Sequence, residues 1–240
     1  MFYFFDPLYF LFLIPGIALG AWAQWRVRSA YDQAGRIAPN SGLSGAEAAN
    51  EVMHAAGVEG IGIEPVSGYL SDHYDPGSKV LRLSEGVYQE RSLAALGIAA
   101  HEAGHAIQDA RHYSPLVMRN ALVPMANFGS RASWLIMIAG FAVASLMREP
   151  TIGRFLVYLG IAAFSLTVVF QLINLPVEFD ASRRAKIALV DSGLITADEQ
   201  RYVSKVLNAA ALTYVAATLT SILTLLYFLV RSGVLGGRRR

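Results

Sequence analysis

Residues 101–105 read His-Glu-Ala-Gly-His, and the spacing of these side chains suits a metal ion. On a helix, positions i and i+4 share one face, so the imidazoles of His101 and His105 can reach the same ion. Zinc binds imidazole nitrogen well, and a catalytic zinc site uses three protein ligands and leaves one position for water. Glu102 can take a proton from that water and pass it to a leaving amine. The pattern predicts zinc-dependent hydrolysis of a peptide bond, with Glu102 as general base and acid and one Zn²⁺ per chain.

The surroundings of the motif favour this interpretation over a helix that merely buries two hydrogen-bonded histidines. At this content of His and Glu, the H-E-x-x-H pattern arises by chance in roughly a few chains per thousand. Residues 93–100 are good helix formers and lead into the motif. Gly104 removes a side chain from within it, where a substrate or a neighbouring helix can come close.

A third zinc ligand has to come from elsewhere in the chain. His112 follows His105 on nearly the same helix face, but a straight helix separates the two by about 10 Å, which is too far to share an ion. His54 and His73 stay open as ligands, although no pattern supports either.

Glu178 is the preferred third ligand. It follows an apolar run within the segment Leu-Pro-Val-Glu-Phe-Asp, residues 175–180, and a carboxylate so near a membrane boundary is costly and marks a functional site. Pro176 is placed to open or kink a helix, which puts Glu178 in its first turn. Taken alone, an acid at that position is explained by the helix macrodipole. Asp180 is the second candidate for the ligand.

Composition predicts that most of the elements holding this site are membrane helices. Hydrophobic residues make up 54% of the 240-residue chain and charged residues 16%, against about 45–50% apolar in an average soluble protein. The excess is gathered in long runs, each sufficient for a transmembrane helix. These runs are residues 8–25, 121–147, 152–175 and 209–230. The expected fold is a mainly α membrane protein with about four transmembrane helices and a small α+β metal-site domain at the membrane surface.

The first run is interpreted as a retained anchor, with a signal peptide as the alternative. No Lys or Arg precedes it, and Asp6 stands where a signal peptide carries positive charge. Residues 21–23, Ala-Trp-Ala, loosely resemble a cleavage site and favour the alternative.

The segment after the first run carries the signals of a small folded domain. Ser44 and Glu47 form a capping-box pattern that opens a helix, and Gly57 ends it. The rest of the segment contains residues that alternate between apolar and polar, which is typical of strands, and residues that favour turns. Strands are expected at 60–66 and 80–83, a turn at Pro76-Gly77 and a helix from about Ser92 to Ala110.

These elements divide the chain into five expected parts. They are an N-terminal transmembrane anchor (1–26), a catalytic domain with the His-Glu-Ala-Gly-His helix (27–120), a transmembrane hairpin (121–175), a helical segment that supplies the third ligand (176–208), and a C-terminal transmembrane helix with a basic tail (209–240).

Charge and cysteine content exclude several classes of function. The net charge of +2 is too small to indicate nucleic-acid binding. Basic clusters at 183–186 and 238–240 flank apolar runs, so lipid headgroups are the expected partners of these side chains. The chain has no cysteine, which excludes disulfides, thiolate zinc sites and a cysteine nucleophile.

The metal motif together with residues 175–184, Leu-Pro-Val-Glu-Phe-Asp-Ala-Ser-Arg-Arg, resembles the YugP-type membrane zinc peptidases of bacteria. More distantly the chain is similar to the gluzincin membrane proteases, the HtpX and CAAX prenyl-protease group. The resemblance covers nearly the whole chain and includes residues 71–76, 83–84 and 106–108. It implies a gluzincin-like domain for the metal site.

In the broader group, a glutamate after a transmembrane segment is the third zinc ligand, which implies that role for Glu178. An aspartate four residues later often accompanies it, but this chain has Ser182 at that place and Asp180 two residues earlier. The group also pairs extended substrate with a segment upstream of the metal helix. This implies residues 69–74 and 80–83 as that edge, with an ordinary hairpin as the alternative.

The sequence does not decide which side chains orient the metal-binding histidines or stabilise the oxyanion. Carboxylates usually orient zinc-bound imidazoles, and a polar or basic group stabilises the oxyanion. Candidates for the first role are Asp72, Asp75 and Asp180, and for the second His73, Tyr74, Tyr88, Arg183 and Arg184.

The expected partners are a peptide or membrane-protein substrate and the lipid bilayer, with no nucleic acid. A cell-membrane location is expected, with the catalytic domain on the cytoplasmic side because that side would hold more Lys and Arg. A protease with its metal inside the bilayer is disfavoured, because the stretch between Arg91 and Asp109 is too short to span. The alternative function is a non-catalytic membrane scaffold with a structural or vestigial metal site, and the presence of Glu102 argues against it.

Overall fold

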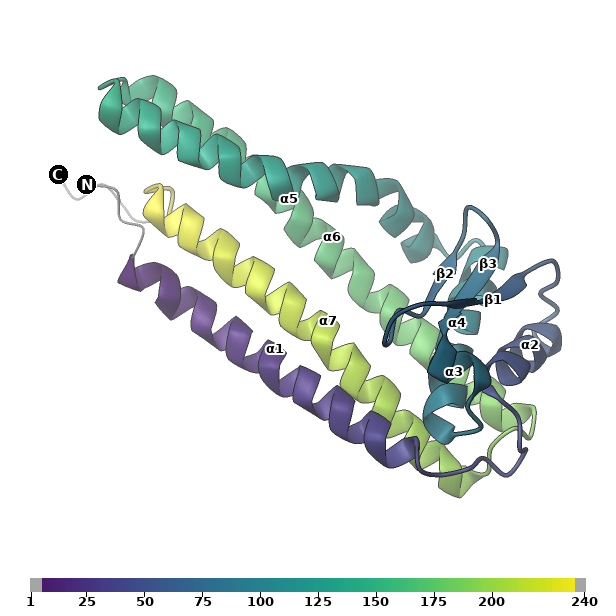
Figure 1. Cartoon of the computed structure of the whole chain (residues 1–240). Helices are drawn as coiled ribbons and strands as arrows, with labels where there is room; N and C mark the ends of the chain where they lie inside the picture. Colours follow the sequence, from purple (N-terminus) through teal and green to yellow (C-terminus); the bar gives the residue numbers. More distant parts are fainter. Residues whose placement is uncertain (1–5, 236–240) are drawn as a thin grey trace. The chain divides into compact units, whose positions relative to one another are not determined.

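The computed structural model describes residues 6–235, and long α-helices dominate it (Figure 1). The elements in chain order are α1 (Pro7–Ala34), α2 (Gly45–Ala55), β1 (Gly62–Val66), β2 (His73–Asp75), β3 (Val80–Ser84), α3 (Glu85–Gln89), α4 (Leu93–Ala110), α5 (Ser114–Leu146), α6 (Pro150–Asp191) and α7 (Ala197–Arg231). The predicted mainly α membrane fold with a small α+β part is confirmed. The basic tail at 238–240 lies outside the described residues.

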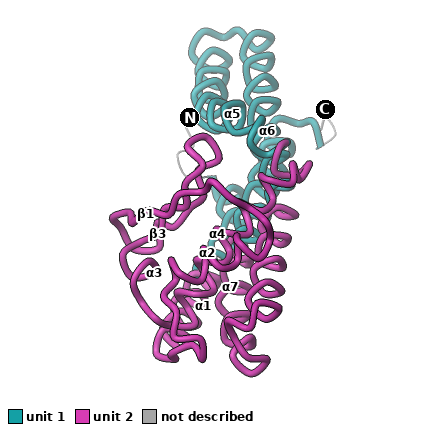
Figure 2. Tube along the Cα trace, turned by 90° about the vertical axis from the view of Figure 1, so that its right-hand side faces the viewer, with its two compact units in different colours: residues 1–21, 118–174, 214–240 teal, residues 22–117, 175–213 magenta. Residues whose placement is uncertain are grey.

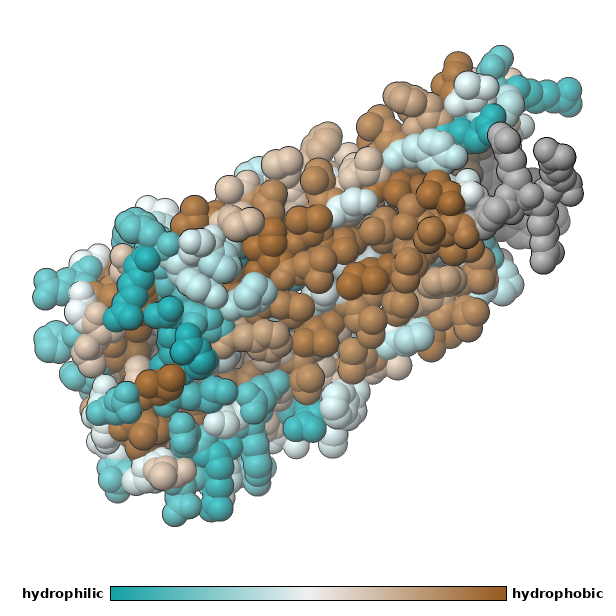
Figure 3. Space-filling view, turned by 180° about the vertical axis from the view of Figure 1, so that it is seen from behind, coloured by the Kyte–Doolittle hydropathy of each residue, from teal (hydrophilic) through white to brown (hydrophobic). Residues whose placement is uncertain are grey.

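Four helices within residues 6–235 are long and apolar enough to cross a membrane: α1, α5, α6 and α7. Their surfaces are hydrophobic over much of the face seen in Figure 3. On α5, for example, the side chains of Phe128 and Leu135 are 72% and 71% exposed. Apolar surface on this scale is costly in water and is accommodated by a lipid bilayer.

The chain divides into two compact units, which Figure 2 draws in different colours. The first consists of residues 1–21, 118–174 and 214–240, and the second of residues 22–117 and 175–213. All residues of the predicted metal site belong to the second unit.

The first unit contains the apolar parts of the four long helices. Its tight α5–α6 hairpin depends on small residues, because a Cβ atom on Gly153 would lie 2.4 Å from that of Ala144. At the ends of α1 and α7, the Asp6 carboxylate accepts a hydrogen bond from the Tyr227 hydroxyl and pairs with Arg231. These contacts hold the helices of this unit together where the hydrophobic effect is weak.

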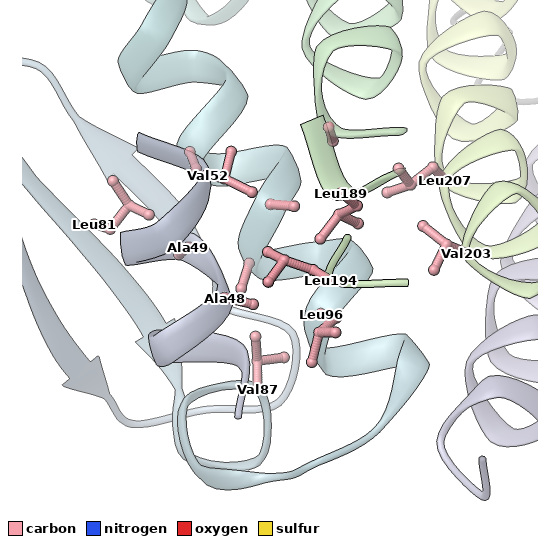
Figure 4. Packing of buried hydrophobic residues seen from close by; sticks show 14 of the residues in the cluster. Ala48, Ala49, Val52, Leu81, Val87, Leu96, Leu189, Leu194, Val203 and Leu207 are labelled. Carbon is pink, nitrogen blue, oxygen red and sulfur yellow. The ribbon is translucent and has the colours of Figure 1, made fainter. Parts of the chain in front are cut away.

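The second unit packs α2, α4 and a three-stranded sheet around one hydrophobic cluster (Figure 4). The strand order is β1-β3-β2, with β1 parallel and β2 antiparallel to β3, so β2 is an edge strand. Val52 of α2, Leu81 of β3 and Leu96 of α4 are fully buried in this cluster. Leu189 of α6 and Val203 of α7 complete it from the C-terminal half, so α6 is anchored against α4.

Hydrogen-bonded caps hold the helices of the second unit, and the sequence predicted those of α2. Ser44 and Glu47 form the capping box of α2, and Gly57 adopts a positive φ of 68° directly after it. Ser92 caps α4 by accepting a hydrogen bond from the backbone N–H of Ala95. These caps satisfy backbone groups that would otherwise be unpaired at the helix ends.

Two expectations about the C-terminal half were wrong in detail. Pro176 does not open a helix but lies inside α6, which continues from Pro150 to Asp191. The expected helical segment over 176–208 is divided by a turn at residues 192–196, where Gly193 takes a positive φ of 65°. A proline in a helix leaves one carbonyl without its usual donor, a loss that long packed helices tolerate.

One short element was not anticipated: α3 has five residues, which is too short for a periodic pattern of hydrophobic residues to be recognised. The strand β2 has three residues and pairs antiparallel with β3. It overlaps residues 69–74, which the family resemblance implied as an extended edge beside 80–83. The strands β1 and β3 and the helix α4 lie where the sequence predicted them.

Candidate metal centre

Helices α4 and α6 bring His101, His105 and Glu178 together, although the glutamate is more than 70 residues away in sequence. One ligand atom of each lies within 4.8 Å of the others. Glu178 Oε2 is 3.3 Å from His101 Nε2 and 3.5 Å from His105 Nε2. Within residues 6–235 this trio is the group of His, Asp and Glu side chains that can hold a metal ion.

The chemistry of this donor set fits a zinc ion. Two imidazole Nε2 atoms and one carboxylate oxygen form the His₂Glu set of catalytic zinc sites, which leaves a position for water. Glu178 is only 3% exposed and His105 7%, and a carboxylate at that depth requires positive charge beside it. Three convergent donors of these types therefore match the donor set of a catalytic rather than a four-ligand structural zinc site.

Close contact between the two helices depends on Gly104. A Cβ atom at this position would lie 2.7 Å from the carbonyl oxygen of Ala181, a separation that real Cβ atoms avoid. The sequence left open whether substrate or a helix approaches Gly104, and the structure assigns the space to α6. Without this glycine, α4 and α6 would have to move apart at the level of the ligands.

Glu102, the expected general base, is held by the edge strand. It is 8% exposed, and its Oε2 accepts a hydrogen bond of 3.0 Å from the backbone N–H of Tyr74 in β2. This bond orients one carboxylate oxygen and places β2 alongside the metal motif. The contact was not predicted, because neither β2 nor its approach to α4 is visible in the sequence pattern.

The Tyr74 hydroxyl points to Asp109 at the end of α4. It donates a hydrogen bond of 2.7 Å to Asp109 Oδ2, which also pairs with Lys79. Burial raises the pKa of Tyr74, and the bond to Asp109 raises it further. Burial alone would raise the pKa of Asp109, but Lys79 and the Tyr74 hydroxyl together hold it below its ordinary value. We call this group of three side chains the β2 latch, because it fastens β2 to α4.

The two candidate aspartates of the β2 region hold the loops of the sheet. Asp72 accepts hydrogen bonds from the backbone N–H and the hydroxyl of Ser84, and burial raises its pKa. Asp75 accepts hydrogen bonds from Ser78 and Arg82, which lower its pKa. His73 is exposed, with its Nδ1 2.9 Å from the carbonyl oxygen of Ser71.

The remaining candidates lie as follows. Arg183 and Arg184 both pair with Asp180, and Tyr88 packs half-buried against the cluster of the second unit. His54 is exposed in the last turn of α2, and His112 is exposed just beyond the end of α4. Neither of these histidines belongs to the ligand trio.

Two further side chains contact the outer nitrogens of the histidine pair. Gln108 Oε1 lies 3.0 Å from His105 Nδ1, and Ser182 Oγ lies 3.1 Å from His101 Nδ1. Gln108 also contacts Asp180. Sequence reasoning missed Gln108, although its position three residues after His105, on the same helix face, is a usable signal. Ser182 stands where the gluzincin membrane proteases often have an aspartate.

Comparison with known proteins agrees with this geometry. A family model described as "Putative neutral zinc metallopeptidase" matches residues 9–233. The chain belongs to this family. The matched range includes His101, His105 and Glu178 and nearly all of the four long helices.

A named relative of the chain is similar along nearly its whole length. The chain is 45% identical over 222 residues, 92% of its own length and 95% of the relative, to a protein named "Putative membrane protease YugP" from Bacillus subtilis (strain 168). No solved structure matches the chain. The resemblance to YugP-type membrane zinc peptidases is thereby confirmed.

Proposed function

We propose that the chain is a membrane-bound zinc endopeptidase in which one zinc ion is held by His101, His105 and Glu178. The observation that carries the proposal is the convergence of these three ligand atoms within 4.8 Å, from two helices, beside a buried glutamate that is not one of the three. A structural zinc site would need a fourth protein ligand and would not need Glu102. Membership of a zinc metallopeptidase family supports the same assignment.

The role of Glu102 follows from its surroundings. A zinc ion held by His101, His105 and Glu178 would polarise the substrate carbonyl and lower the pKa of a bound water to about 7. Glu102 Oε2 is occupied by the Tyr74 backbone N–H, so we assign proton transfer to Oε1. The glutamate takes the proton of the attacking water and later delivers it to the leaving amine, which acid–base residues do within hydrogen-bond reach.

Substrate is proposed to bind in extended form beside the edge strand β2. This strand pairs with β3 on one side only, and its other side faces α4 through the Tyr74 to Glu102 bond. Edge strands bind extended peptides through backbone hydrogen bonds. Membrane proteins and peptides released at the bilayer surface are the substrate class that this position favours.

We propose a cell-membrane location with the metal centre on the cytoplasmic side. With four spans, the side of the metal motif carries Arg26, Arg28, Arg119, Arg131, Arg183, Arg184 and Lys186, and the other side carries Arg148, Arg154, Arg231 and residues 238–240. An excess of Lys and Arg marks the cytoplasmic side. Since the chain has no cysteine, single cysteines introduced at Ser41 and at Glu149 can be labelled in intact cells. Labelling at position 149 by an impermeant reagent, with protection at position 41, is expected; the reverse pattern would contradict the orientation.

The third ligand is tested by metal analysis of the full-length protein in detergent. We expect one zinc per chain in the wild type and in Asp180→Ala, and loss of zinc in Glu178→Ala. Full retention in Glu178→Ala would refute the ligand assignment and direct attention to Asp180, His73 or His54. A wild type without metal, even after zinc is added back, would refute the metal centre and favour the non-catalytic scaffold.

A further inference from the structure

We propose that Gln108 is a positioning residue for the zinc site, whose amide couples Asp180 to His105 and fixes the tautomer of that histidine. This inference rests on the function proposed above. It assigns a role to a side chain that is fully buried, at 0% exposure, and that is neither a ligand nor the general base. The coupling runs from α6, through α4, to the ligand atom of His105.

The orientation of the Gln108 amide is determined by its neighbours. The Nε2 atom lies 2.9 Å from the carbonyl oxygen of Val177 and 2.9 Å from Asp180 Oδ2. A carbonyl and a carboxylate only accept hydrogen bonds, so the NH₂ group must face both. The flipped amide would set an oxygen against two acceptors at a buried position, which is costly. The Oε1 atom therefore faces His105.

This orientation decides where the proton of His105 lies. Gln108 Oε1 is 3.0 Å from His105 Nδ1, and an amide oxygen can only accept. Nδ1 must then carry the hydrogen, and in a neutral imidazole the lone pair is left on Nε2. Nε2 is the atom that lies 3.5 Å from Glu178 Oε2, so the neutral form of His105, which is the form that binds zinc, has its lone pair on the atom that faces the ligand trio.

Asp180 is held in place for this role. Its carboxylate pairs with Arg183 and Arg184, three and four residues later on the same helix. These cations stabilise the ionised form, which is the form that accepts from Gln108. Val177 and Asp180 flank Glu178 in sequence. A single amide of α4 thus binds the turn of α6 that carries the third ligand, and fixes both ligands at once.

His101 is held less strictly. Its Nδ1 contacts Ser182 Oγ at 3.1 Å, and a hydroxyl can either donate or accept. Ser182 therefore does not select one tautomer, whereas Gln108 does. We infer that His105 is the ligand that is oriented in advance and that His101 adjusts on metal binding.

The first test measures the zinc dissociation constant of the full-length protein in detergent by competition with a chelating indicator. Gln108→Leu is expected to weaken zinc binding by about 10–100-fold, the usual effect of losing the outer partner of a ligating histidine. Asp180→Ala is expected to weaken it less, because Val177 still accepts from the amide. In the Gln108→Leu background, Asp180→Ala should cause no further loss, since Asp180 acts through Gln108.

The control is Ser92→Ala, which removes the buried cap of α4 without touching the ligands. It should lower the melting temperature and leave the zinc dissociation constant within about twofold of the wild type, because a lost cap acts on helix stability alone. This variant separates loss of zinc affinity from general destabilisation of the helix that carries the motif.

The second test observes the tautomer directly in metal-free protein. With ¹⁵N-labelled histidine, NMR at a pH where the His105 signals are those of a neutral ring should show the Nδ1–H form in the wild type. In Gln108→Leu, the two tautomers should mix. A merely structural glutamine would not change this signature.

The outcomes separate the two proposals. Equal zinc affinity in Gln108→Leu and the wild type, or an Nε2–H tautomer for His105, would overturn the coupling and leave the metal centre standing. An undiminished effect of Asp180→Ala in the Gln108→Leu background would show that Asp180 acts on the metal by itself, which also overturns it. A wild type that binds no zinc would refute the proposed function and the coupling together.

Discussion

The backbone of Ala181 occupies the space where a side chain on Gly104 would begin, with 2.7 Å between its carbonyl oxygen and a Cβ atom at position 104. This contact lies one residue before His105 and three residues after Glu178. The backbones of α4 and α6 are therefore in close contact beside the proposed metal centre. The two histidines of α4 and the glutamate of α6 can meet because position 104 is a glycine.

Gly104→Ala is expected to weaken zinc binding and destabilise the fold, because overpacking at a close helix contact costs about 1–3 kcal/mol. The matched control is Gly20→Ala in α1, where no atom lies within 4 Å of an added Cβ. Thermal unfolding and zinc content of both variants check this prediction. Normal zinc content and stability in Gly104→Ala would show that α6 can move away without loss.

Glu102→Gln should abolish cleavage and leave zinc in place. The amide keeps an oxygen for the Tyr74 N–H, but it cannot accept the proton of the attacking water, and loss of a general base costs about 10²–10⁴-fold. Zinc content and turnover of an unfolded model substrate are the measurements. The control is Glu51→Gln, an exposed glutamate of α2, which should leave both unchanged. A catalytic rate in Glu102→Gln close to that of the wild type would remove Glu102 from the mechanism.

Tyr74→Phe is expected to loosen the β2 latch without removing the bond to Glu102, which comes from the backbone. Stability should fall by about 1 kcal/mol, typical of one lost hydrogen bond, and cleavage by the folded protein should stay within a few-fold. If Tyr74 instead stabilised the oxyanion, the catalytic rate would fall by about 10²–10³-fold. Comparing unfolding with the rate at saturating substrate decides between these roles.

Asp109→Asn should destabilise the protein at neutral pH and matter less in acid. The folded-state pKa of Asp109 lies below its ordinary value, so its ionised form contributes stability above the unfolded pKa of about 3.9. That contribution disappears as the pH falls through the folded pKa. Melting temperatures of the variant and the wild type should therefore converge below about pH 4. If the melting temperatures of Asp109→Asn and the wild type differed by the same amount at every pH, the charge of Asp109 would not be the cause of its stabilising effect.

Much of the metal site could be predicted because its signals are local in sequence. The helical spacing of His101 and His105 and the helix start near Ser92 depend on residues within one helix. Glu178 was preferred because a carboxylate directly after an apolar run is costly, and the family resemblance supported the same residue, although no spacing rule connects it with α4. Gln108 was missed because its partners on α6 are 69 and 72 residues away, so its role appears only when the two helices are packed together.

The same reasoning explains the errors in secondary structure. Pro176 is a strong local signal for a helix start, but it was overridden because α6 is packed and buried on both sides of the proline, at Asn174 and Val177. The strand β2 exists because it pairs with β3 and contacts Glu102. Its polar residues carry no pattern of their own, so only the tertiary structure defines it.

The bond from the Tyr74 backbone to Glu102 has a consequence for which substitutions the chain can accept. Since the donor is an amide that nineteen of the twenty amino acids possess, the orientation of the general base does not depend on the side chain at this position. Drift in sequence at position 74 can therefore alter the β2 latch while the catalytic carboxylate stays in place. Proline is the exception, because it alone has no N–H to donate. In a library of all substitutions at position 74, cleavage activity should persist with a broad range of residues and be lost with proline.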